Sequence, residues 1–234
     1  NRLADFPHYL MHRAEQLDNL YIFKNTEGTP ENIRKFHPNI IVSSTGSAPL
    51  LPPIAGLKDR IDNENHNIYS ILGMISHIND FPKDLEGKKV VVVGGGAVGL
   101  DVVEFFADRN ADISIVEMMD QIGRDLDPVS KNDTKTMMKK HNVHQLTKTA
   151  LLEVKDSSFL VKGDGEPYEL PFEYGFVCLG MRAQGQLYQN LTEEFSSEDV
   201  EIMNIGDSQR ARRIIDGTQE GRNILTVLEQ KGYL

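Results

Sequence analysis

The sequence predicts an α/β protein built around a parallel sheet, and three patterns lead to that prediction. Residues 89–93 are one Lys and four Val in a row, as expected of a strand that is buried on both faces. A glycine-rich turn and an apolar helical pattern follow, and a β-branched strand over 113–117 completes a βαβ unit. Period-two alternation over 151–172 then predicts a β-meander.

The first eighty residues predict smaller elements of mixed type. Thr29-Pro30 indicates where a helix begins, because proline is favoured in a first helical turn. Prolines at 49, 52 and 53 predict a non-helical linker, and we place a domain crossing within 48–60. The expected elements here are a helix over 8–18, a strand over 20–23, a helix from 30, a buried strand over 39–44 and a helix over 70–78.

The rest of the chain alternates between the same two patterns. Asp127-Pro128 indicates the start of a helix that runs to 141, and the last apolar pattern predicts a helix over 212–230. Buried-type strands are expected over 176–180 and 202–207.

Composition excludes several classes of protein. The 234 residues amount to about one and a half domains of ~150 residues. Apolar residues make up 39%, and the net charge of −10 argues against a nucleic-acid or anionic-membrane surface. The sequence has no membrane-spanning run and no signal-peptide pattern. Its single cysteine excludes an internal disulfide and agrees with a cytoplasmic location. Without an initiator Met, we expect an excised piece of a longer protein.

The turn Gly94-x-Gly96-x-x-Gly99 lies between the clearest strand and the clearest helix. The first glycine allows a sharp turn, the second lets a pyrophosphate approach the backbone, and the third lets helix and strand pack closely. Ala97 and Val98 lie between them, where N–H groups and the helix dipole attract an anion. This context predicts a Rossmann-like dinucleotide site, and the alternative is a glycine turn in a nucleotide-free fold.

Glu117 ends the second strand, 21 residues after Gly96, where an acidic residue is expected to accept the ribose hydroxyls. Its carboxylate would repel the 2′-phosphate of NADP, and Met118 offers no compensating charge. We therefore favour NAD(H). Arg124 lies a few residues further along and keeps NADP(H) open as the alternative.

Four stretches together resemble one known family. They are the crossing strand 40–49, the fingerprint VVVVGGGAVGLDVVE over 90–104, the stretch IVEMMDQIGRD over 115–125, and a closing stretch that runs from Asn204-Ile205-Gly206-Asp207 through Arg212-Arg213-Ile214-Ile215-Asp216 to Glu220-Gly221. The sequence resembles the pyridine-nucleotide-dependent flavoprotein reductases. The fit is best to the FAD/NAD-binding C-terminal half of the NADH:flavin oxidoreductase, 2-enoate reductase, 2,4-dienoyl-CoA reductase and trimethylamine dehydrogenase group, and it covers about residues 10–230.

The resemblance implies an NAD(H)-binding domain over 84–182 inserted into an FAD-binding domain made of 1–83 and 183–234. It also implies cofactor contacts at Thr45, Gly46, Gly180, Gly206, Asp207, Arg213 and Ile214. On residues alone, a plain strand-to-helix cap is the favoured explanation of Gly206-Asp207.

Departures from the family bear on the cofactors. No second Gly-x-Gly-x-x-Gly precedes Gly94, so the βαβ unit that would hold the FAD pyrophosphate is absent and the FAD domain is incomplete. The family's N-terminal barrel, with FMN and an iron–sulfur cluster, would be the missing half of the same polypeptide. One cysteine cannot ligate such a cluster. Ser44 replaces the family's usual small Ala before Thr-Gly.

Three functions are compatible with these patterns. The first is the NADH-binding and FAD-linked electron-transfer part of a flavin oxidoreductase, which passes hydride from NADH to FAD. The second is a non-catalytic dinucleotide-binding module that binds NAD(H) and binds FAD weakly or not at all, and a stand-alone NAD sensor is a third reading. We name no catalytic residue and no metal ligand. His141 and His144 are expected on the surface, Cys178 in the core, and the acidic run 192–199 in a solvated loop.

Overall fold

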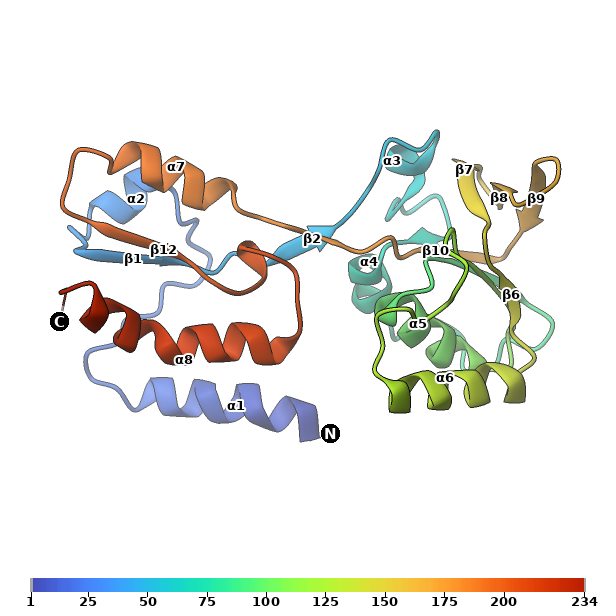
Figure 1. Ribbon diagram of the computed structural model, residues 1–234, viewed down its shortest axis with the longest axis horizontal. Helices are drawn as coiled ribbons and strands as arrows, with labels where there is room; N and C mark the ends of the chain where they lie inside the picture. The colour runs from blue at the N-terminus through green and yellow to red at the C-terminus, as the bar shows by residue number, and fades with distance from the viewer. Residues whose placement is uncertain (1, 234) are drawn as a thin grey trace. The chain divides into compact units, whose positions relative to one another are not determined.

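The computed structural model describes residues 2–233, with side chains from residue 5. The chain divides into two compact units. One comprises the residues up to 43 together with 186–203, and the other comprises 44–185 together with 204–234. Each unit is described by itself, with the labels of Figure 1.

The larger unit is organised by a five-stranded parallel sheet in the order β3-β10-β4-β5-β6. The strands are β3 (Ile68–Tyr69), β4 (Lys89–Val93), β5 (Asp112–Val116), β6 (His144–Leu146) and β10 (Tyr174–Val177). Val92 of β4 is the Cα partner of Ile115 on one side and of Phe176 on the other. The predicted βαβ unit is therefore confirmed, with β4 at the centre of the sheet.

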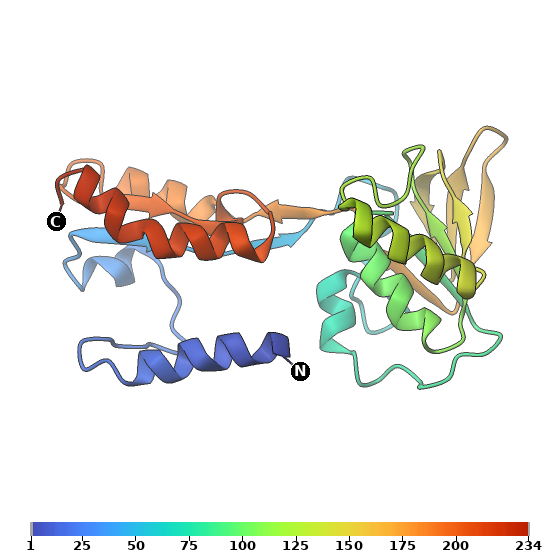
Figure 2. The same ribbon diagram turned by 60° about the horizontal axis from the view of Figure 1, so that its bottom comes forward.

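The two faces of this sheet are covered by different layers (Figures 1 and 2). Val90 and Val92 pack with helix α5 (Ala97–Ala107), helix α6 (Pro128–Lys140) and helix α4 (Ile71–Ser76). Val91 and Val93 pack instead with helix α3 (Leu57–Arg60) and the antiparallel meander β7-β8-β9. The meander strands are β7 (Ala150–Val154), β8 (Ser158–Lys162) and β9 (Tyr168–Pro171). Burial on both faces explains the unbroken valine run.

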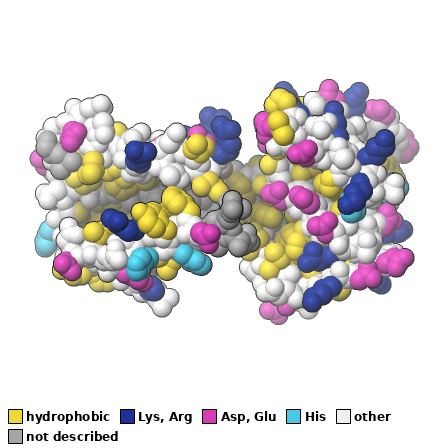
Figure 3. All heavy atoms as spheres, turned by 90° about the horizontal axis from the view of Figure 1, so that it is seen from below, with side chains coloured by type: hydrophobic (Ala, Val, Ile, Leu, Met, Phe, Trp, Pro, Cys, Tyr) yellow, Lys and Arg dark blue, Asp and Glu magenta, His cyan; other side chains and the backbone are white. Residues whose placement is uncertain are grey.

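Aromatic rings fill the helical side of the core. The Phe106 ring centroid lies 4.8 Å from that of Phe176 and 5.2 Å from that of Phe81. Both Phe106 and Phe176 are fully buried, and such rings bury large apolar areas. The face of the larger unit that is seen from below, where α6 lies, carries interspersed acidic and basic side chains (Figure 3). The helical layer is therefore apolar inwards and solvated outwards.

Two short antiparallel strands form a separate sheet in this unit. They are β2 (Ser47–Pro49) and β11 (Met181–Ala183), and Met181 is the Cα partner of Pro49. The closing segment has one 3₁₀ turn, η1 (Gly206–Ser208), and helix α8 (Ile214–Gln230). Gly206 and Gly217 come close there, because a Cβ on Gly217 would lie 3.4 Å from the Gly206 Cα.

The smaller unit has a two-stranded sheet of β1 (Ile40–Ser43) and β12 (Glu201–Asn204). Its helices are α1 (Arg2–Glu15), α2 (Pro30–Arg34) and α7 (Gln186–Glu194). The buried core of this unit is small and is centred on Ile41, Leu191 and Phe195. Large apolar side chains of α1 and the following segment stay exposed, Tyr21 at 77% among them. The described part of this unit therefore leaves much apolar surface uncovered.

The structure corrects four predictions about elements. The strand expected over 202–207 ends at Asn204, and a 3₁₀ turn follows at Gly206–Ser208. No strand forms over 20–23, because these residues are exposed and pair with no described strand. The linker contains a short helix at Leu57–Arg60, where Leu57 is fully buried. The acidic run is partly helical, since α7 extends to Glu194, and Glu194 and Glu198 both pair with Arg34. The domain boundaries at 83/84 and 182/183 remain predictions.

Candidate functional site

The glycine turn lies where the sheet order reverses. After β4 the chain continues through α5 to β5 on one side, whereas β10 lies on the other side of β4. The carboxyl ends of β4 and β10 therefore flank a crevice of the kind in which open parallel sheets bind ligands. Gly94 is fixed in it by its N–H, which donates to the Val116 carbonyl oxygen at 2.8 Å.

The three predicted glycines have three different environments. Gly94 has a φ of +111°, and a Cβ there would lie 2.1 Å from the Cys178 carbonyl oxygen. A Cβ on Gly99 would lie 1.9 Å from the Gly94 carbonyl oxygen, so the helix needs glycine to pack on the turn. A Cβ on Gly96 would meet nothing closer than Asp125 at 3.9 Å. Only the second glycine leaves open space, and a phosphate would approach the backbone there.

Helix α5 begins directly after Gly96, which is its N-cap. The first N–H groups of a helix have no intrahelical acceptor, and here they belong to Ala97, Val98 and the residue that follows. Together with the helix dipole they form an anion site made of backbone. Such a site does not conflict with the net charge of −10.

A cavity of about 530 Å³ opens beside this turn. Its walls come from the linker, the ends of β4, β5 and β10, and the start of β7. This volume lies within the usual range for small-molecule sites. The lining residues are Pro52, Ile54, Val93, Gly94, Gly96, Val98, Val116, Glu117, Met118, Thr149, Ala150, Leu151, Cys178, Leu179 and Gly180.

Glu117 is the carboxylate of this cavity, and backbone groups hold it on both oxygens. Its Oε2 accepts from the Gly95 N–H at 2.6 Å, and its Oε1 accepts from the Met119 N–H at 2.7 Å. The Gly95 carbonyl group is also fixed, because its oxygen accepts from the Gly123 N–H at 2.7 Å. Each carboxylate oxygen keeps a further lone pair for a ligand hydroxyl.

Arg124 lies on a second hollow next to Glu117. This hollow measures about 380 Å³ and is also lined by Gly95, Gly96, Met119, Gln121 and Asp125. Arg124 is exposed, and its carbonyl oxygen accepts from the Lys131 ammonium at 3.0 Å. Ala97 lines neither of these spaces and faces a hollow between α5 and α6. Of the residues predicted for the nucleotide site, Gly94, Gly96, Val98, Glu117, Met118 and Gly180 line the cavity and Arg124 lines the second hollow, whereas Ala97 and Gly99 line neither.

Cys178 both packs in the core and lines the cavity. Burial raises the pKa of its thiol to about 12, and the nearby Asp101 carboxylate adds to this. The thiol is therefore protonated at neutral pH and is a poor nucleophile. The sequence predicted packing and gave no signal for the position beside the cavity.

Gly180 lies at the rim of the cavity and begins the connection to β11. It has a φ of +106°, and a Cβ there would meet nothing within 4 Å. Its carbonyl oxygen accepts from the Leu50 N–H at 2.9 Å. Thr45 and Gly46 hold the end of the same connection, because the Thr45 hydroxyl donates to the Gln184 carbonyl at 2.6 Å and Gln184 N–H donates to Gly46 at 3.0 Å.

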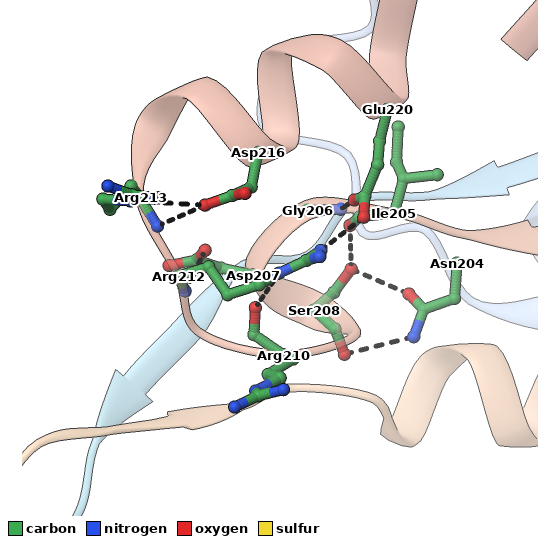
Figure 4. Close-up of polar contacts among 10 residues, drawn as sticks. All are labelled: Asn204, Ile205, Gly206, Asp207, Ser208, Arg210, Arg212, Arg213, Asp216 and Glu220. Carbon is green, nitrogen blue, oxygen red and sulfur yellow. Dashed lines mark hydrogen bonds and ion pairs between the residues drawn. The ribbon is translucent and has the colours of Figure 1, made fainter. Parts of the chain in front are cut away.

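Asp207 lies on η1, held between β2 and the residues before α8 (Figure 4). Its Oδ2 accepts from the Ser47 hydroxyl at 3.2 Å, and its Oδ1 accepts from the Arg212 N–H at 3.1 Å. Gly206 precedes it with a φ of +66°, a conformation that favours glycine. The Asp207 carboxylate therefore belongs to a polar network that includes Ser47 and Arg212, and it is not only a helix cap.

Arg213 and Ile214, which begin α8, are both strongly exposed. The Arg213 side chain is 88% exposed and Ile214 is 82% exposed. Arg213 donates its backbone N–H to the Asp216 carboxylate at 3.1 Å, which caps the helix. A guanidinium and an apolar side chain therefore flank the Asp207 turn without cover from the described chain.

The remaining candidates give no metal site. The described residues hold no cluster of His, Cys, Asp and Glu that could bind a metal ion. His144 lies 3.3 Å from the Asp112 carboxylate, and His141 follows α6 as its C-cap. Among residues 2–233, no helix is both long and apolar enough to cross a bilayer.

This chain is similar to a known family and to several known proteins. Residues 14–203 match the family described as pyridine nucleotide-disulphide oxidoreductase. The metal reductase of Desulforamulus reducens is 27% identical over 94% of this chain and 36% of its own length. The NADH oxidase of Thermoanaerobacter brockii is 26% identical over 82% of this chain and 28% of its own.

Among solved structures, a 2-naphthoyl-CoA reductase complex matches with a TM-score of 0.75 at 21% identity. The match covers 93% of this chain and 31% of that protein. At this identity the likeness shows the fold, which is the expected Rossmann-like dinucleotide-binding type. The chain spans about a third of the length of the relatives it matches. With the family pattern matched over most of its length, the chain belongs to the pyridine nucleotide-disulphide oxidoreductase family.

Proposed function

We propose that this chain is the NADH-binding and FAD-linked electron-transfer portion of a flavin-dependent oxidoreductase. Family membership implies a pyridine nucleotide and FAD as cofactors, and the curated relatives have the names of oxidoreductases. The observation that carries the proposal is the open Cβ position of Gly96 beside the 530 Å³ cavity. Space there admits a pyrophosphate to the start of α5.

The residues around the cavity suit the parts of NADH. The backbone of Gly96, Ala97 and Val98 would bind the pyrophosphate, and Glu117 would accept the adenosine ribose hydroxyls. Met118, 68% exposed, would cover the adenine end. NADH is preferred over NADPH in this proposal because the Glu117 carboxylate repels a 2′-phosphate.

The closing segment suits part of an FAD. Asp207 would accept from a ribityl hydroxyl, and Arg213 with Ile214 would lie against the flavin. The bound dinucleotides would supply the redox chemistry, a hydride transfer from the nicotinamide to the flavin. The chain's own residues bind and orient, and none of them is required to carry a proton. The substrate-reducing half would be a separate flavin barrel outside these 234 residues.

A second candidate is a dinucleotide-binding module without turnover. It is favoured by the smaller unit, whose described sheet has two strands and a small buried core. Such a unit offers no described glycine turn for a second pyrophosphate. In this case the chain binds NADH and does not bind FAD.

Two titrations of the 234-residue chain separate these candidates. Calorimetric titration with NADH and NADPH tests the cavity, and titration with FAD followed by flavin fluorescence tests the closing segment. Binding of both NADH and FAD, with loss of the flavin absorbance band on anaerobic addition of NADH, supports the first proposal. Binding of NADH alone supports the second. Failure to bind either nicotinamide nucleotide refutes both.

A further inference from the structure

Glu220 on α8 lies at the centre of a closed polar ring around the Asp207 turn (Figure 4). Its Oε2 accepts from the Gly206 N–H at 2.6 Å. Its Oε1 pairs with the Arg212 guanidinium at 2.5 Å. The Arg212 backbone N–H in turn donates to Asp207, the residue next to Gly206. The ring therefore returns to the turn from which it starts.

Each contact in this ring restrains a different degree of freedom of Asp207. The Glu220–Gly206 bond fixes the peptide that precedes Asp207, where the φ of +66° must be maintained. The Glu220–Arg212 pair fixes the backbone whose N–H orients the Asp207 carboxylate. Charge-assisted bonds of this kind are the stronger class of hydrogen bond. Both side chains of the pair are about a quarter exposed, at 28% for Glu220 and 27% for Arg212.

The carboxylate of Glu220 is held in its charged form by these same groups. The Gly206 N–H and, after it, the Arg212 guanidinium lower the pKa of Glu220. The Asp207 carboxylate keeps its remaining lone pairs, since Ser47 and Arg212 each use one oxygen. Asp207 is thus oriented and still able to accept from a ligand.

We propose that Glu220 is a positioning residue for flavin binding, acting through Gly206 and Arg212 on Asp207. This inference rests on the proposed function, because the ligand of Asp207 is taken to be the ribityl chain of FAD. Glu220 itself need not contact the flavin. Its effect is to hold the turn Gly206–Ser208 in the geometry in which Asp207 binds FAD.

A double-mutant cycle on the 234-residue chain tests this inference, with FAD as the probe and NADH as the internal reference. Glu220→Ala should weaken FAD binding about tenfold, and Arg212→Ala should weaken it less, because Gly206 keeps its acceptor. The double variant should be no worse than Glu220→Ala alone, since both act through one ring. Glu220→Gln should recover part of the affinity, because its amide oxygen can accept from Gly206.

Controls separate positioning from general loss of structure. Glu229→Ala, on the last turn of the same helix, should bind FAD as the unaltered chain does. NADH affinity should stay constant in every variant, because the glycine turn takes no part in the ring. A parallel loss of NADH affinity, or equal FAD affinity for Glu220→Ala and the unaltered chain, overturns the inference. Absence of FAD binding by the unaltered chain refutes the proposed flavin site, and the role of Glu220 falls with it.

Discussion

Exchanging single glycines for alanine in one turn should separate folding from nucleotide binding. In Gly94→Ala the new Cβ would lie 2.1 Å from the Cys178 carbonyl oxygen, at a φ of +111°. The backbone strain costs about 1–3 kcal/mol and the overpacking about as much again. A loss of about 4 kcal/mol should lower the melting temperature by roughly 10 °C in a chain of this size.

Gly96→Ala should instead change stability little and weaken NADH binding strongly. The φ of −78° suits any residue, and the nearest atoms to the new Cβ are 3.9 Å away. Ala is a poorer N-cap than Gly, but it also reduces the entropy of the unfolded chain, so stability should change by less than about 1 kcal/mol. The methyl group occupies the approach of the pyrophosphate, and NADH affinity should fall roughly ten- to a hundredfold.

Thermal unfolding followed by circular dichroism and calorimetric NADH titration measure the two effects. Gly165→Ala, in a turn of the meander with nothing within 4 Å, is the matched control and should leave both quantities unchanged. The reasoning is refuted if Gly96→Ala binds NADH as tightly as the unaltered chain. It is also refuted if Gly94→Ala melts at the unaltered temperature.

Three further predictions follow from other side chains. Glu117→Ala should weaken NADH binding more than NADPH binding, and an equal loss in two parallel titrations would show that Glu117 does not contact the ribose. Cys178 should react with iodoacetamide at pH 8 roughly a thousandfold more slowly than a thiol of pKa 9.0, because its own pKa is about 12, and mass spectrometry gives the rate. The pKa of Asp156 is lowered by its hydrogen bond with Arg60, so its contribution to stability is present above its unfolded-state pKa and disappears as the pH falls through its folded-state pKa. Denaturant unfolding should therefore show Asp156→Asn to be destabilised at pH 7 and matched to the unaltered chain in acid.

Local sequence patterns were sufficient to predict a strand wherever that strand is buried on both faces. The valine run 89–93 becomes β4 with the predicted bounds, and the meander forms where the period is two. Residues 20–23 show the limit of this rule. Their apolar run has the composition of a strand, yet no described strand pairs with them, and pairing is a tertiary property. Strands of two or three residues, such as β3 and β11, carry too little pattern to predict.

The two candidate sites differ in what sequence can say of them. The nucleotide turn is specified locally, since Gly94, Gly96 and Gly99 act through backbone geometry over six residues. The contact between Glu117 and Gly95 also follows from the spacing in the sequence, because adjacent parallel strands end at the same edge of the sheet. The Asp207 site is instead assembled from β2, η1 and α8, and neither Ser47 nor Glu220 had a spacing that marked it.

This difference bears on how an acidic protein could hold two anionic cofactors. At the glycine turn the carboxylate of Glu117 takes two N–H donors, so its charge is stabilised by dipoles and the helix start stays open to phosphate. At the closing segment Glu220 likewise takes the Gly206 N–H and the Arg212 guanidinium, while Arg213, whose Nε lies 3.9 Å from the Asp216 carboxylate, keeps a side chain that is 88% exposed. In both places a glutamate carboxylate accepts a hydrogen bond from a glycine N–H and so fixes the glycine backbone. Ligand recognition is then left to groups whose geometry that glutamate determines, and so a net charge of −10 is compatible with binding two dinucleotides.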